Sequence, residues 1–279
     1  YLLDRGDLEV TVATRTVAKA ERLLAGYKHG KAVALDANDT ERVRELVARA
    51  DLSVSLLPPS MHVAVAKYAL EARRHFLTTS YVSPGLKALD EDVRKAGLTF
   101  LNEVGLDPGI DHMSALRIIH AIEERGGKVV SFRSYCGALP APEADTNPWG
   151  YKFSWSPRGV VLAGRNSARY LEDGEEKTLP GERLFSRHWL VDVKGFGEFE
   201  AYYNRDSIPY IGTYGLGAVR DMYRATLRYP GWSYTMQKLA DLGYFGLEDL
   251  EGPPATYAAL AAALAQVPED GGLAGRVAG

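Results

Sequence analysis

The sequence contains a single cysteine, Cys136, among its 279 residues. One cysteine excludes an internal disulfide and is typical of a protein from a reducing compartment. No run of about 18 apolar residues occurs, which argues against a membrane span. The N-terminus also lacks a basic region followed by an apolar stretch, so we predict no secretory signal peptide. We therefore expect a cytoplasmic protein.

An excess of positive charge is also absent. The net charge is -3 and the pI is about 6.1, which argues against nucleic acid as a partner. Apolar residues make up 46% of the chain and charged residues 25%, as in soluble globular proteins. The length fits one large domain or two ordinary ones. We predict no metal site, and we note a homodimer as an option that composition does not test.

The glycine-rich phosphate loop of dinucleotide-binding proteins is missing. No Gly-x-Gly-x-x-Gly opens a helix, and the glycines at 215 and 217 follow no convincing strand. The chain has no initiator methionine, and Tyr1–Arg5 resembles the last turn of a helix that stops at Gly6. We expect a fragment that begins inside an element, with the first strand and its loop upstream. The second and fourth strands would then lose their shared neighbour.

Short apolar strands alternate with helices over the first 102 residues. This alternation with short connections predicts an α/β fold with a doubly wound parallel sheet. A flavodoxin-like or hydrolase-like sheet would give the same alternation. We expect Thr40 to cap the second helix. The predicted strands are 8–14, 31–35, 52–57, 75–79 and 99–102, and the predicted helices are 17–26, 40–49, 61–74 and 86–96.

Arg15 narrows this choice, because it directly follows the strand at 8–14. In a Rossmann-type sheet, the residue after the second strand lies beside the adenosine ribose. An acid there binds the 2′-hydroxyl, whereas an arginine accommodates a 2′-phosphate. Arg15 therefore favours NADP over NAD, although a solvated arginine at a helix start is the alternative. Asp36 ends the next strand and would lie near the adenine, or would simply form a turn.

From about residue 104 the chain becomes rich in aromatic residues and isolated arginines. We predict a cofactor domain at 1–103 and a second α/β domain, for substrate, at 104–279. Ser156 and Pro157 form a clear helix start. The predicted elements are a helix at 111–125, a strand at 128–136, a helix at 156–170, a hairpin at 190–203, a loop at 204–217, helical or mixed segments at 219–229 and 233–242, and a helix at 255–267.

The stretch from Asn102 to His112 joins the two predicted domains. Asp107 precedes Pro108-Gly109, and its carboxylate could stabilise a cation or bind an ammonium group, or could simply form the turn. We expect Asp111 to be an N-cap, with His112 in the first helical turn. A lone histidine of this kind is more often a supporting or surface residue than a catalytic one.

Four other positions have chemical interest. Tyr81 follows the strand at 75–79, and ligands collect at the carboxyl ends of such strands. It could face the nicotinamide or the substrate, or pack as an aromatic lid. Arg205 and Arg228 are the clearest candidates for binding carboxylates, since guanidinium groups bind them with two parallel hydrogen bonds. Each could equally be an ordinary surface or ion-paired arginine, and Cys136 a small buried side chain.

Five motifs of the chain are Gly105–His112, Ser134–Gly137, Leu139–Glu143, Asn147–Ser156 and Thr226–Tyr229. Together they resemble one family, the saccharopine reductases, which are the NADP(+), L-glutamate-forming saccharopine dehydrogenases. The resemblance implies a Rossmann domain that binds NADP(H) and a second α/β domain for substrate. It also implies that aminoadipate semialdehyde and glutamate form an imine, which is reduced to saccharopine in lysine biosynthesis.

The resemblance also implies roles for individual residues. Thr14, Arg15 and Thr16 would hold the 2′-phosphate, and Asp36 and Ala37 would border the adenine. The remaining cofactor contacts would come from Leu57, Ser80, Leu106, Asp107, Pro108 and Ser154. The saccharopine contacts would be Tyr81, Asp107, Arg205, Thr226, Leu227 and Arg228.

The chain departs from the family pattern in three ways. The phosphate loop is missing, the family usually has cysteine where Thr14 stands, and the family continues beyond this C-terminus. Two alternatives stay open: an NAD-linked saccharopine dehydrogenase of lysine degradation, and a non-catalytic remnant with an interaction role. In the favoured interpretation Asp107 stabilises a cationic iminium, and Tyr81, His112 or water supplies the proton.

Overall fold

The fold is seen in a computed structural model of the chain, which describes residues 1–217, 219–250, 252, 254–268, 272 and 275. The chain forms two compact units, Tyr1–His112 and Met113–Gly279. Among the described residues, no helix is both long and apolar enough to cross a membrane.

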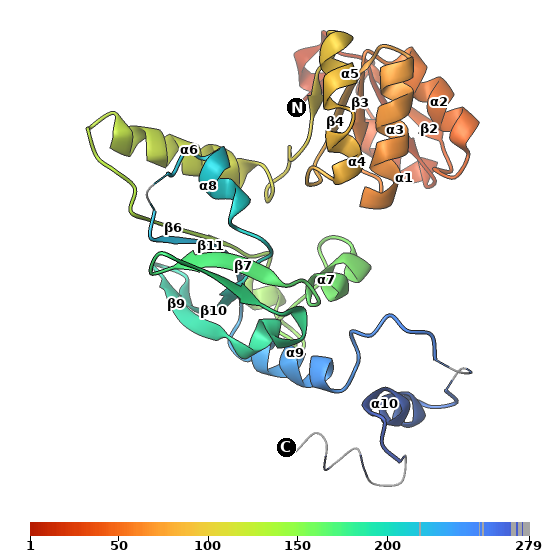
Figure 1. Cartoon of the computed structure of the whole chain (residues 1–279). Helices are drawn as coiled ribbons and strands as arrows, with labels where there is room; N and C mark the ends of the chain where they lie inside the picture. The colour runs from red at the N-terminus through yellow and green to blue at the C-terminus, as the bar shows by residue number, and fades with distance from the viewer. Residues whose placement is uncertain (218, 251, 253, 269–271, 273–274, 276–279) are drawn as a thin grey trace. The chain divides into compact units, whose positions relative to one another are not determined.

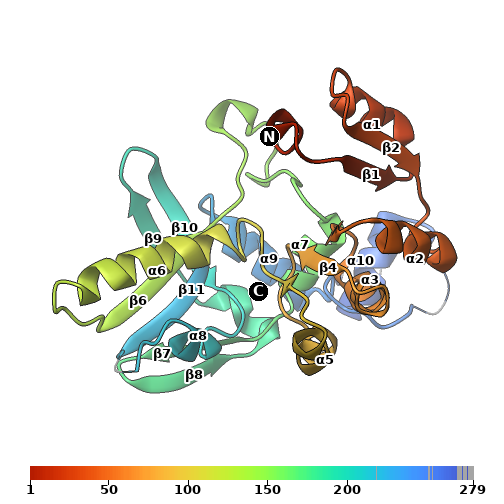
Figure 2. The same ribbon diagram turned by 90° about the horizontal axis from the view of Figure 1, so that it is seen from above.

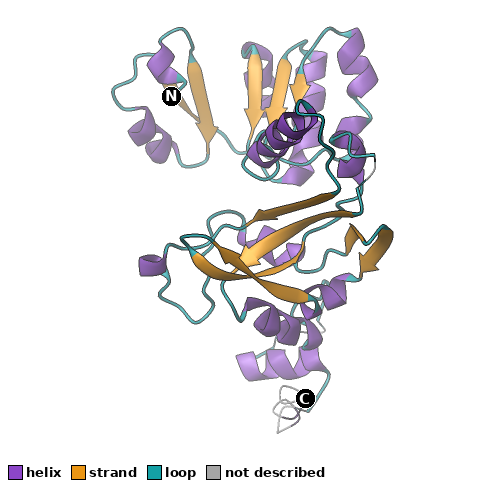
Figure 3. Ribbon diagram, turned by 90° about the vertical axis from the view of Figure 1, so that its left-hand side faces the viewer, coloured by secondary structure: helices purple, strands orange, loops and turns teal. Residues whose placement is uncertain are grey.

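The first unit contains the five strands that the sequence predicted, all in parallel pairs. Strands β1 (Val10–Thr14) and β2 (Gly30–Ala34) form one pair. Strands β3 (Leu52–Ser55), β4 (His75–Thr78) and β5 (Phe100–Leu101) form a sheet in that order. Figure 3 shows these strands in orange, with helices beside them. The predicted parallel α/β arrangement is confirmed.

The parallel strands of this unit fall into two separate sheets. Among residues 1–112, all of which are described, β1 pairs with β2 alone and β3 pairs with β4 alone. The side chains of Leu52 and Val54 on β3 are exposed. The gap between β1 and β3 is the one that the sequence predicted between the second and fourth strands. The predicted helical turn at the start is confirmed as the 3-10 helix η1 (Leu3–Arg5), which ends at Gly6.

The helices of this unit match the predicted positions with two corrections. Asp39, not Thr40, caps α2, because its carboxylate accepts a 3.0 Å hydrogen bond from the Arg42 N–H. The predicted helix at 86–96 is two short helices. Figure 1 labels the five helices, which are α1 (Val17–Leu24), α2 (Thr40–Arg49), α3 (Pro59–Glu71), α4 (Pro84–Lys87) and α5 (Asp90–Lys95).

Helices α2 and α3 bury their apolar sides against the sheet. Phe76 of β4 is fully buried, and its ring lies 5.4 Å from that of Phe100. Val43 and Val47 of α2 and Ala66 of α3 belong to the same buried cluster. Full burial of a Val or Phe side chain typically adds about 1.5–3 kcal/mol to the stability of the fold. This packing fixes the carboxyl ends of β3 and β4, which Leu57, Ser80 and Tyr81 of the candidate site follow.

The second unit is built on a mixed sheet. Among the described residues six strands take part, in the order β8-β7-β11-β10-β9, and β6 pairs in parallel with β11. The other pairs are antiparallel. The strands are β6 (Ser131–Cys136), β7 (Ala168–Glu172), β8 (Glu175–Leu179), β9 (His188–Val193), β10 (Gly197–Tyr203) and β11 (Asp221–Arg228).

Helices cover this sheet. Residues of α6 (Ile110–Glu123) pack with Tyr214 and with Met222 of β11. The helix α9 (Trp232–Asp241) packs against β10 and the 3-10 helix η3 (Gly181–Ser186). Figure 2 labels α9 and the strands of this sheet as seen from above. A second buried cluster contains stacked aromatic rings, and the ring centroids of Tyr170 and Tyr203 lie 3.7 Å apart. The remaining helices are η2 (Pro142–Ala144), α7 (Pro157–Ala163), α8 (Pro209–Thr213) and α10 (Tyr257–Ala265).

Several predictions for the second unit need correction. The helix that starts at Ser156-Pro157 is confirmed, and the Ser156 hydroxyl accepts from the Gly159 N–H, but it ends at Ala163 instead of Tyr170. The β7–β8 hairpin at 168–179 was not predicted. The segment at 219–229, predicted as helical or mixed, is mainly the strand β11. The segment at 204–217, predicted as a loop, contains the short helix α8.

Candidate active site

The segment after β4 and the stretch from Asn102 to His112 lie against each other. The Glu103 N–H donates to the Ser80 carbonyl at 3.0 Å, and the Val104 N–H donates to the Thr78 carbonyl at 3.2 Å. This contact brings together two side chains that the sequence had singled out separately. The Tyr81 hydroxyl donates a 3.0 Å hydrogen bond to an oxygen of the Asp107 carboxylate.

The backbone around Asp107 is a tight turn. The Gly105 N–H donates to the Pro108 carbonyl at 2.9 Å, and the Ile110 N–H donates to the Gly105 carbonyl at 2.9 Å. Gly109 has φ +149°, and a Cβ built on it would lie 2.1 Å from the Gly105 carbonyl oxygen. Only glycine fits this position. The turn therefore fixes where the Asp107 side chain starts.

The prediction that Asp111 caps the next helix is wrong. Helix α6 begins at Ile110, so Asp111 already lies inside the first turn. Its carboxylate instead accepts a 2.6 Å hydrogen bond from the Gly109 N–H. This contact closes the turn from its other side. His112 does lie in the first turn of the helix, as predicted.

Glu103, which the sequence did not single out, supports the same turn. Its carboxylate accepts from the Val82 N–H at 3.1 Å and lies 2.9 Å from Nε2 of His112. The backbone of Glu103 has φ +59°, in the left-handed region that is uncommon for residues other than glycine. His112 therefore connects the helix start to the loop after β4. Glu103 follows the end of a strand, and that position was the only sequence sign of its role.

Ser80 lies beside a buried histidine. Its hydroxyl is 2.8 Å from Nε2 of His62 on α3, and the other ring nitrogen of His62 is 2.9 Å from the Ser55 hydroxyl. Burial lowers the pKa of His62 below its usual value. The sequence prediction missed His62, because nothing in a helical segment marks one histidine as facing a strand end.

The residues predicted to hold a 2′-phosphate lie together at the end of β1. Thr14 is the last residue of β1, and Thr16 precedes α1 without capping it through its side chain. Arg15 is exposed, and in the described part of the chain its side chain has no hydrogen bond or ion pair. A helix start without a side-chain cap and a guanidinium without a hydrogen-bond partner among the described residues can both bind an anion.

The next predicted cofactor residues follow β2 and β3. The Asp36 carboxylate accepts from the backbone N–H and the side-chain amide of Asn38, at 2.9 and 3.0 Å. It therefore forms a turn, which was the alternative interpretation of this residue. Ala37 follows in the same turn. Leu57 comes two residues after β3 and is packed against the core of the first unit.

In the second unit, the Thr226–Arg228 stretch is the end of β11. Thr226 is paired with Cys136 of β6 on one side and with Tyr202 of β10 on the other. Cys136 is half-buried. Gly137 follows directly, and a Cβ there would lie 2.6 Å from the Leu227 carbonyl oxygen. The close approach of these strands fixes the backbone of the predicted substrate contacts.

Arg228 is a buried cation. Its guanidinium lies over the rings of Tyr151, at 4.8 Å, and Trp232, at 5.2 Å, and donates to the Leu227 carbonyl at 2.8 Å. Its Nε is buried without a hydrogen-bond partner, and among the described residues no carboxylate forms an ion pair with it. The acid opposite it in the sheet, Glu200, instead accepts from the N–H groups of Gly231 and Ser233.

Arg205 and Ser154 lie elsewhere in the second unit. Arg205 is exposed, follows β10 and has φ +56°. The preceding N–H, that of Asn204, donates to the Arg224 carbonyl, so Arg205 lies toward the opposite end of β11 from Arg228. Ser154 is exposed in the segment before α7. Neither residue is in the same cluster as Arg228.

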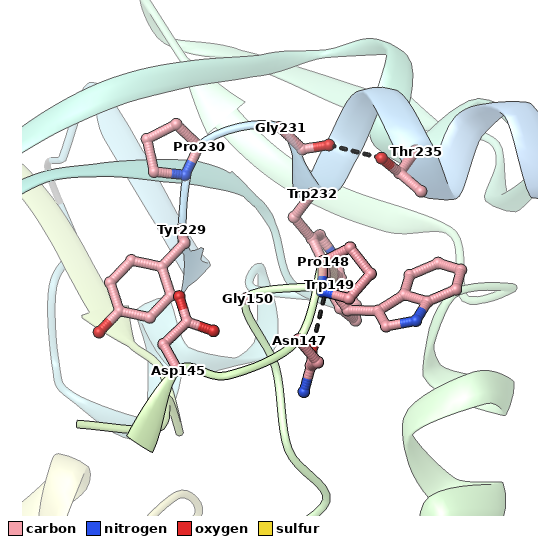
Figure 4. Close-up of a pocket in the computed structure, with 10 residues that line it drawn as sticks. All are labelled: Asp145, Asn147, Pro148, Trp149, Gly150, Tyr229, Pro230, Gly231, Trp232 and Thr235. Carbon is pink, nitrogen blue, oxygen red and sulfur yellow. Dashed lines mark hydrogen bonds between the residues drawn. The ribbon is translucent and has the colours of Figure 1, made fainter. Parts of the chain in front are cut away.

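A hollow of about 260 Å³ lies next to the end of β11 and is shown in Figure 4. Its polar side chains mostly bind their own segments: Asn147 accepts from the Trp149 N–H, and Thr235 donates to the Gly231 carbonyl. None of the predicted site residues lines it. The lining residues are Asp145, Asn147, Pro148, Trp149, Gly150, Tyr229, Pro230, Gly231, Trp232 and Thr235. Among the described residues, no cluster of three or more metal-ligating side chains occurs.

Two family models match the chain, one after the other. Residues 1–101 match the saccharopine dehydrogenase NADP binding domain, and residues 105–267 match the saccharopine dehydrogenase C-terminal domain. The junction between the two matches lies in the stretch that carries Asp107.

Curated relatives share much of the sequence. The saccharopine dehydrogenase [NADP(+), L-glutamate-forming] of Pyricularia oryzae is 44% identical over 252 residues, which are 90% of this chain and 55% of that protein. The enzyme of the same name from Saccharomyces cerevisiae is 43% identical over 237 residues, 85% of this chain and 53% of that protein. The chain thus spans about half the length of these relatives.

More distant and structural relatives agree. The mitochondrial alpha-aminoadipic semialdehyde synthase of Mus musculus is 37% identical over 89% of this chain and 27% of that protein. The solved structure of apo saccharopine dehydrogenase (L-Glu forming) from Saccharomyces cerevisiae has a TM-score of 0.80 and 37% identity, and covers 99% of this chain and 66% of that one. The sequence motifs, the similar solved structure and both family matches lead to the same conclusion: this chain belongs to the saccharopine dehydrogenase family.

Proposed function

We propose that the protein carrying this chain is an NADPH-dependent oxidoreductase that reduces the imine of aminoadipate semialdehyde and L-glutamate to saccharopine, reversibly, in lysine biosynthesis. The observation that carries the proposal is the hydrogen bond between Tyr81 and Asp107 at the carboxyl end of β4. It occurs in a chain that is 44% identical to an NADP(+), L-glutamate-forming enzyme over nine-tenths of its length. We keep 1–103 and 104–279 as the proposed cofactor and substrate domains.

The residues of the first unit fit an NADP(H) cofactor. We take the two parallel sheets as parts of one Rossmann-type doubly wound sheet, with β1 and β2 carrying the adenosine end. The exposed guanidinium of Arg15 and the uncapped start of α1 would then hold the 2′-phosphate, with Thr14 and Thr16 beside it. The adenine would lie along Asp36 and Ala37. Leu57, Ser80, Leu106, Pro108 and Ser154 complete the proposed cofactor contacts.

The bound cofactor would supply a hydride to the carbon of the C=N bond. The Asp107 carboxylate would stabilise the cationic iminium, and this kind of contact typically accounts for about 10²-fold or more in rate. The Tyr81 hydroxyl, as donor to Asp107, holds that carboxylate in place. The source of the proton is left open between Tyr81, His112 and water.

The second unit would hold the carboxylates of the substrate. Arg228 is a buried guanidinium with no carboxylate partner among the described residues. A buried charge without a partner is unfavourable, so an anionic ligand that pairs with Arg228 would be stabilised there. The backbone N–H of Asn204 donates to the carbonyl of Arg224 on β11, and Arg205 is the next residue after Asn204. At about 3.3 Å per residue, Arg224 and Arg228 lie about 13 Å apart along β11. An extended substrate with a carboxylate at each end suits this separation, and Thr226 and Leu227 lie between the two positions.

The test uses the full-length gene product. With aminoadipate semialdehyde, glutamate and NADPH, we expect oxidation of NADPH that requires both substrates, and saccharopine as the product by mass spectrometry. With saccharopine and NADP+, we expect glutamate and NADPH. A protein that binds NADPH but turns over in neither direction would contradict the proposal.

The two alternatives give different results in the same assay. An NAD-linked enzyme would prefer NADH, whereas the position of Arg15 predicts a preference for NADPH. A non-catalytic remnant would form no saccharopine with either cofactor.

A further inference from the structure

We propose that His62 is a positioning residue for cofactor binding, which fixes the Ser80 hydroxyl and the Ser80–Val82 segment at the carboxyl end of β4. This inference rests on the proposed function, because it assumes that Ser80 contacts NADP(H). His62 itself lies on α3, behind the strand ends, and would not touch the cofactor.

The geometry around His62 connects two strand ends through one ring. Nδ1 lies 2.9 Å from the Ser55 hydroxyl, at the end of β3. Nε2 lies 2.8 Å from the Ser80 hydroxyl and 3.2 Å from that of Thr78, at the end of β4. His62 is 2% exposed, and Thr78 and Ser55 are also buried. Hydrogen bonds in such a dry site are strong, and they order the groups that they join.

The segment after β4 is held at three consecutive residues. The Ser80 hydroxyl is held by His62, the Tyr81 hydroxyl by Asp107, and the Val82 N–H by Glu103. Of these three contacts, the one with His62 holds the segment from the side of the sheet. Without it, the Ser80 hydroxyl could turn to other acceptors, and the segment that carries Tyr81 would be held from one side only.

A purely structural histidine would show a different pattern of contacts. The space between α3 and the sheet is otherwise apolar, since Val65, Ala66 and Ala69 of the same helix pack on Phe76. An apolar side chain would fill such a place without burying a further polar group beside the buried hydroxyls of Ser55 and Thr78. The hydroxyls that His62 joins instead stand at the ends of the strands that also lead into Leu57 and Ser80, two proposed cofactor contacts.

The test compares two variants of His62. Each keeps a hydrogen-bonding group on one side of the ring only, either the Ser80 side or the Ser55 side. In His62→Gln the amide reaches the place of Nε2 and can still bond to Ser80. In His62→Asn the amide reaches only the place of Nδ1, next to Ser55. We expect His62→Asn to raise the KM and the Kd for NADPH about tenfold, which is the loss of one hydrogen bond in a buried site. We expect His62→Gln to stay within about threefold of the wild type on the same grounds.

The measurement uses NADPH and the full-length gene product, with Kd from quenching of protein fluorescence and with kcat measured separately. We expect kcat to change less than KM. In a Ser80→Ala background, the Gln and Asn variants should have the same KM, because the group that His62 positions is gone. Thermal unfolding of each variant shows whether it is folded, and His62→Met, which fills the space without hydrogen bonds, replaces an Asn variant that does not fold, with the same expected rise in KM.

The outcomes separate this inference from the proposed function. Wild-type protein that does not bind NADPH would overturn the proposed function. Wild-type binding that is equally tight in His62→Asn, or effects of His62 and Ser80 substitutions that simply add, would overturn the role of His62 and leave the proposed function standing.

Discussion

The hydroxyl of Tyr81 lies 3.0 Å from the carboxylate of Asp107, although the two residues are 26 positions apart in the sequence. One follows a strand of the parallel sheet, and the other lies in the turn before α6. The backbone contacts of Ser80 and Glu103 bring the two segments together. The pair is therefore set by the fold and not by local sequence.

Replacing Asp107 by asparagine removes the charge and keeps an oxygen that can accept from Tyr81. We expect kcat to fall about 10²-fold, because the cationic iminium loses its counter-charge. The Kd for NADPH should stay near that of the wild type. Asp51→Asn is the control, since Asp51 is exposed and pairs with Arg74 at the surface. Equal rates for wild type and Asp107→Asn would show that this carboxylate is not part of the chemistry.

Arg15→Ala should weaken binding of NADPH and leave that of NADH unchanged. A hydrogen bond to a charged group contributes about 1.5–3 kcal/mol, so we expect the KM for NADPH to rise about 10- to 100-fold. Arg22→Ala is the matched control, because Arg22 is exposed in the last turn of the same helix. Steady-state kinetics with the two cofactors give the comparison. If an Arg15→Asp variant kept its preference for NADPH, the argument from Arg15 would fail.

Arg228→Lys keeps the positive charge but loses the planar group that lies over Tyr151 and Trp232. We expect the KM for saccharopine to rise about tenfold or more, because a lysine cannot bind a carboxylate with two parallel hydrogen bonds. The Kd for NADPH should not change. The exposed Arg220 offers the control variant Arg220→Lys. A rise in both constants, with a lower unfolding temperature, would indicate a structural role instead.

Gly109→Ala should disturb the turn that carries Asp107. The new Cβ would lie 2.1 Å from the Gly105 carbonyl oxygen at a backbone φ of +149°. Strain of this kind costs about 1–3 kcal/mol, so we expect a lower unfolding temperature and a lower kcat. Gly212→Ala is the control, because a Cβ there meets no atom within 4 Å. The account of the turn would be wrong if both variants unfolded at the same temperature and kept full activity.

Some of the fold could be predicted because the responsible interactions are local. The cap and the proline at Ser156-Pro157 determine a helix start by themselves, and the strands at 52–57 and 75–79 are marked by apolar runs. The end of that helix depends on tertiary contacts, so it was placed at Tyr170 instead of Ala163. The strand β11 is buried on both faces over much of its length, so no alternation of polar and apolar residues marks it.

The missed hairpin did have a local sign. Strands β7 and β8 are joined by Asp173-Gly174, and both residues have positive φ, at +55° and +84°. Asp-Gly is a preferred pair for a two-residue hairpin turn. In the candidate site, by contrast, no local pattern marks His62, and the only sign of Glu103 is its place after the end of a strand. Their roles depend on partners 18 and 21 residues away, at Ser80 and Val82.

The protein should become less stable toward unfolding at acid pH because of His62. Burial lowers the pKa of His62, so between that lowered value and about 6.5 the unfolded chain binds a proton that the folded chain does not. The free energy of unfolding should therefore fall as the pH drops below about 6.5. Urea unfolding of wild type and His62→Gln over this range isolates the effect, since the variant lacks the group. An identical pH dependence in the two proteins would contradict it.

The most direct test of the site is a structure of the full-length gene product with NADP(H) and saccharopine bound. We expect an oxygen of Asp107 within hydrogen-bond distance of the secondary amine of saccharopine, and the guanidinium of Arg228 on one of its carboxylates. If Asp107 lies far from the amine, or if Arg228 contacts no part of the ligand, the account of this site is wrong.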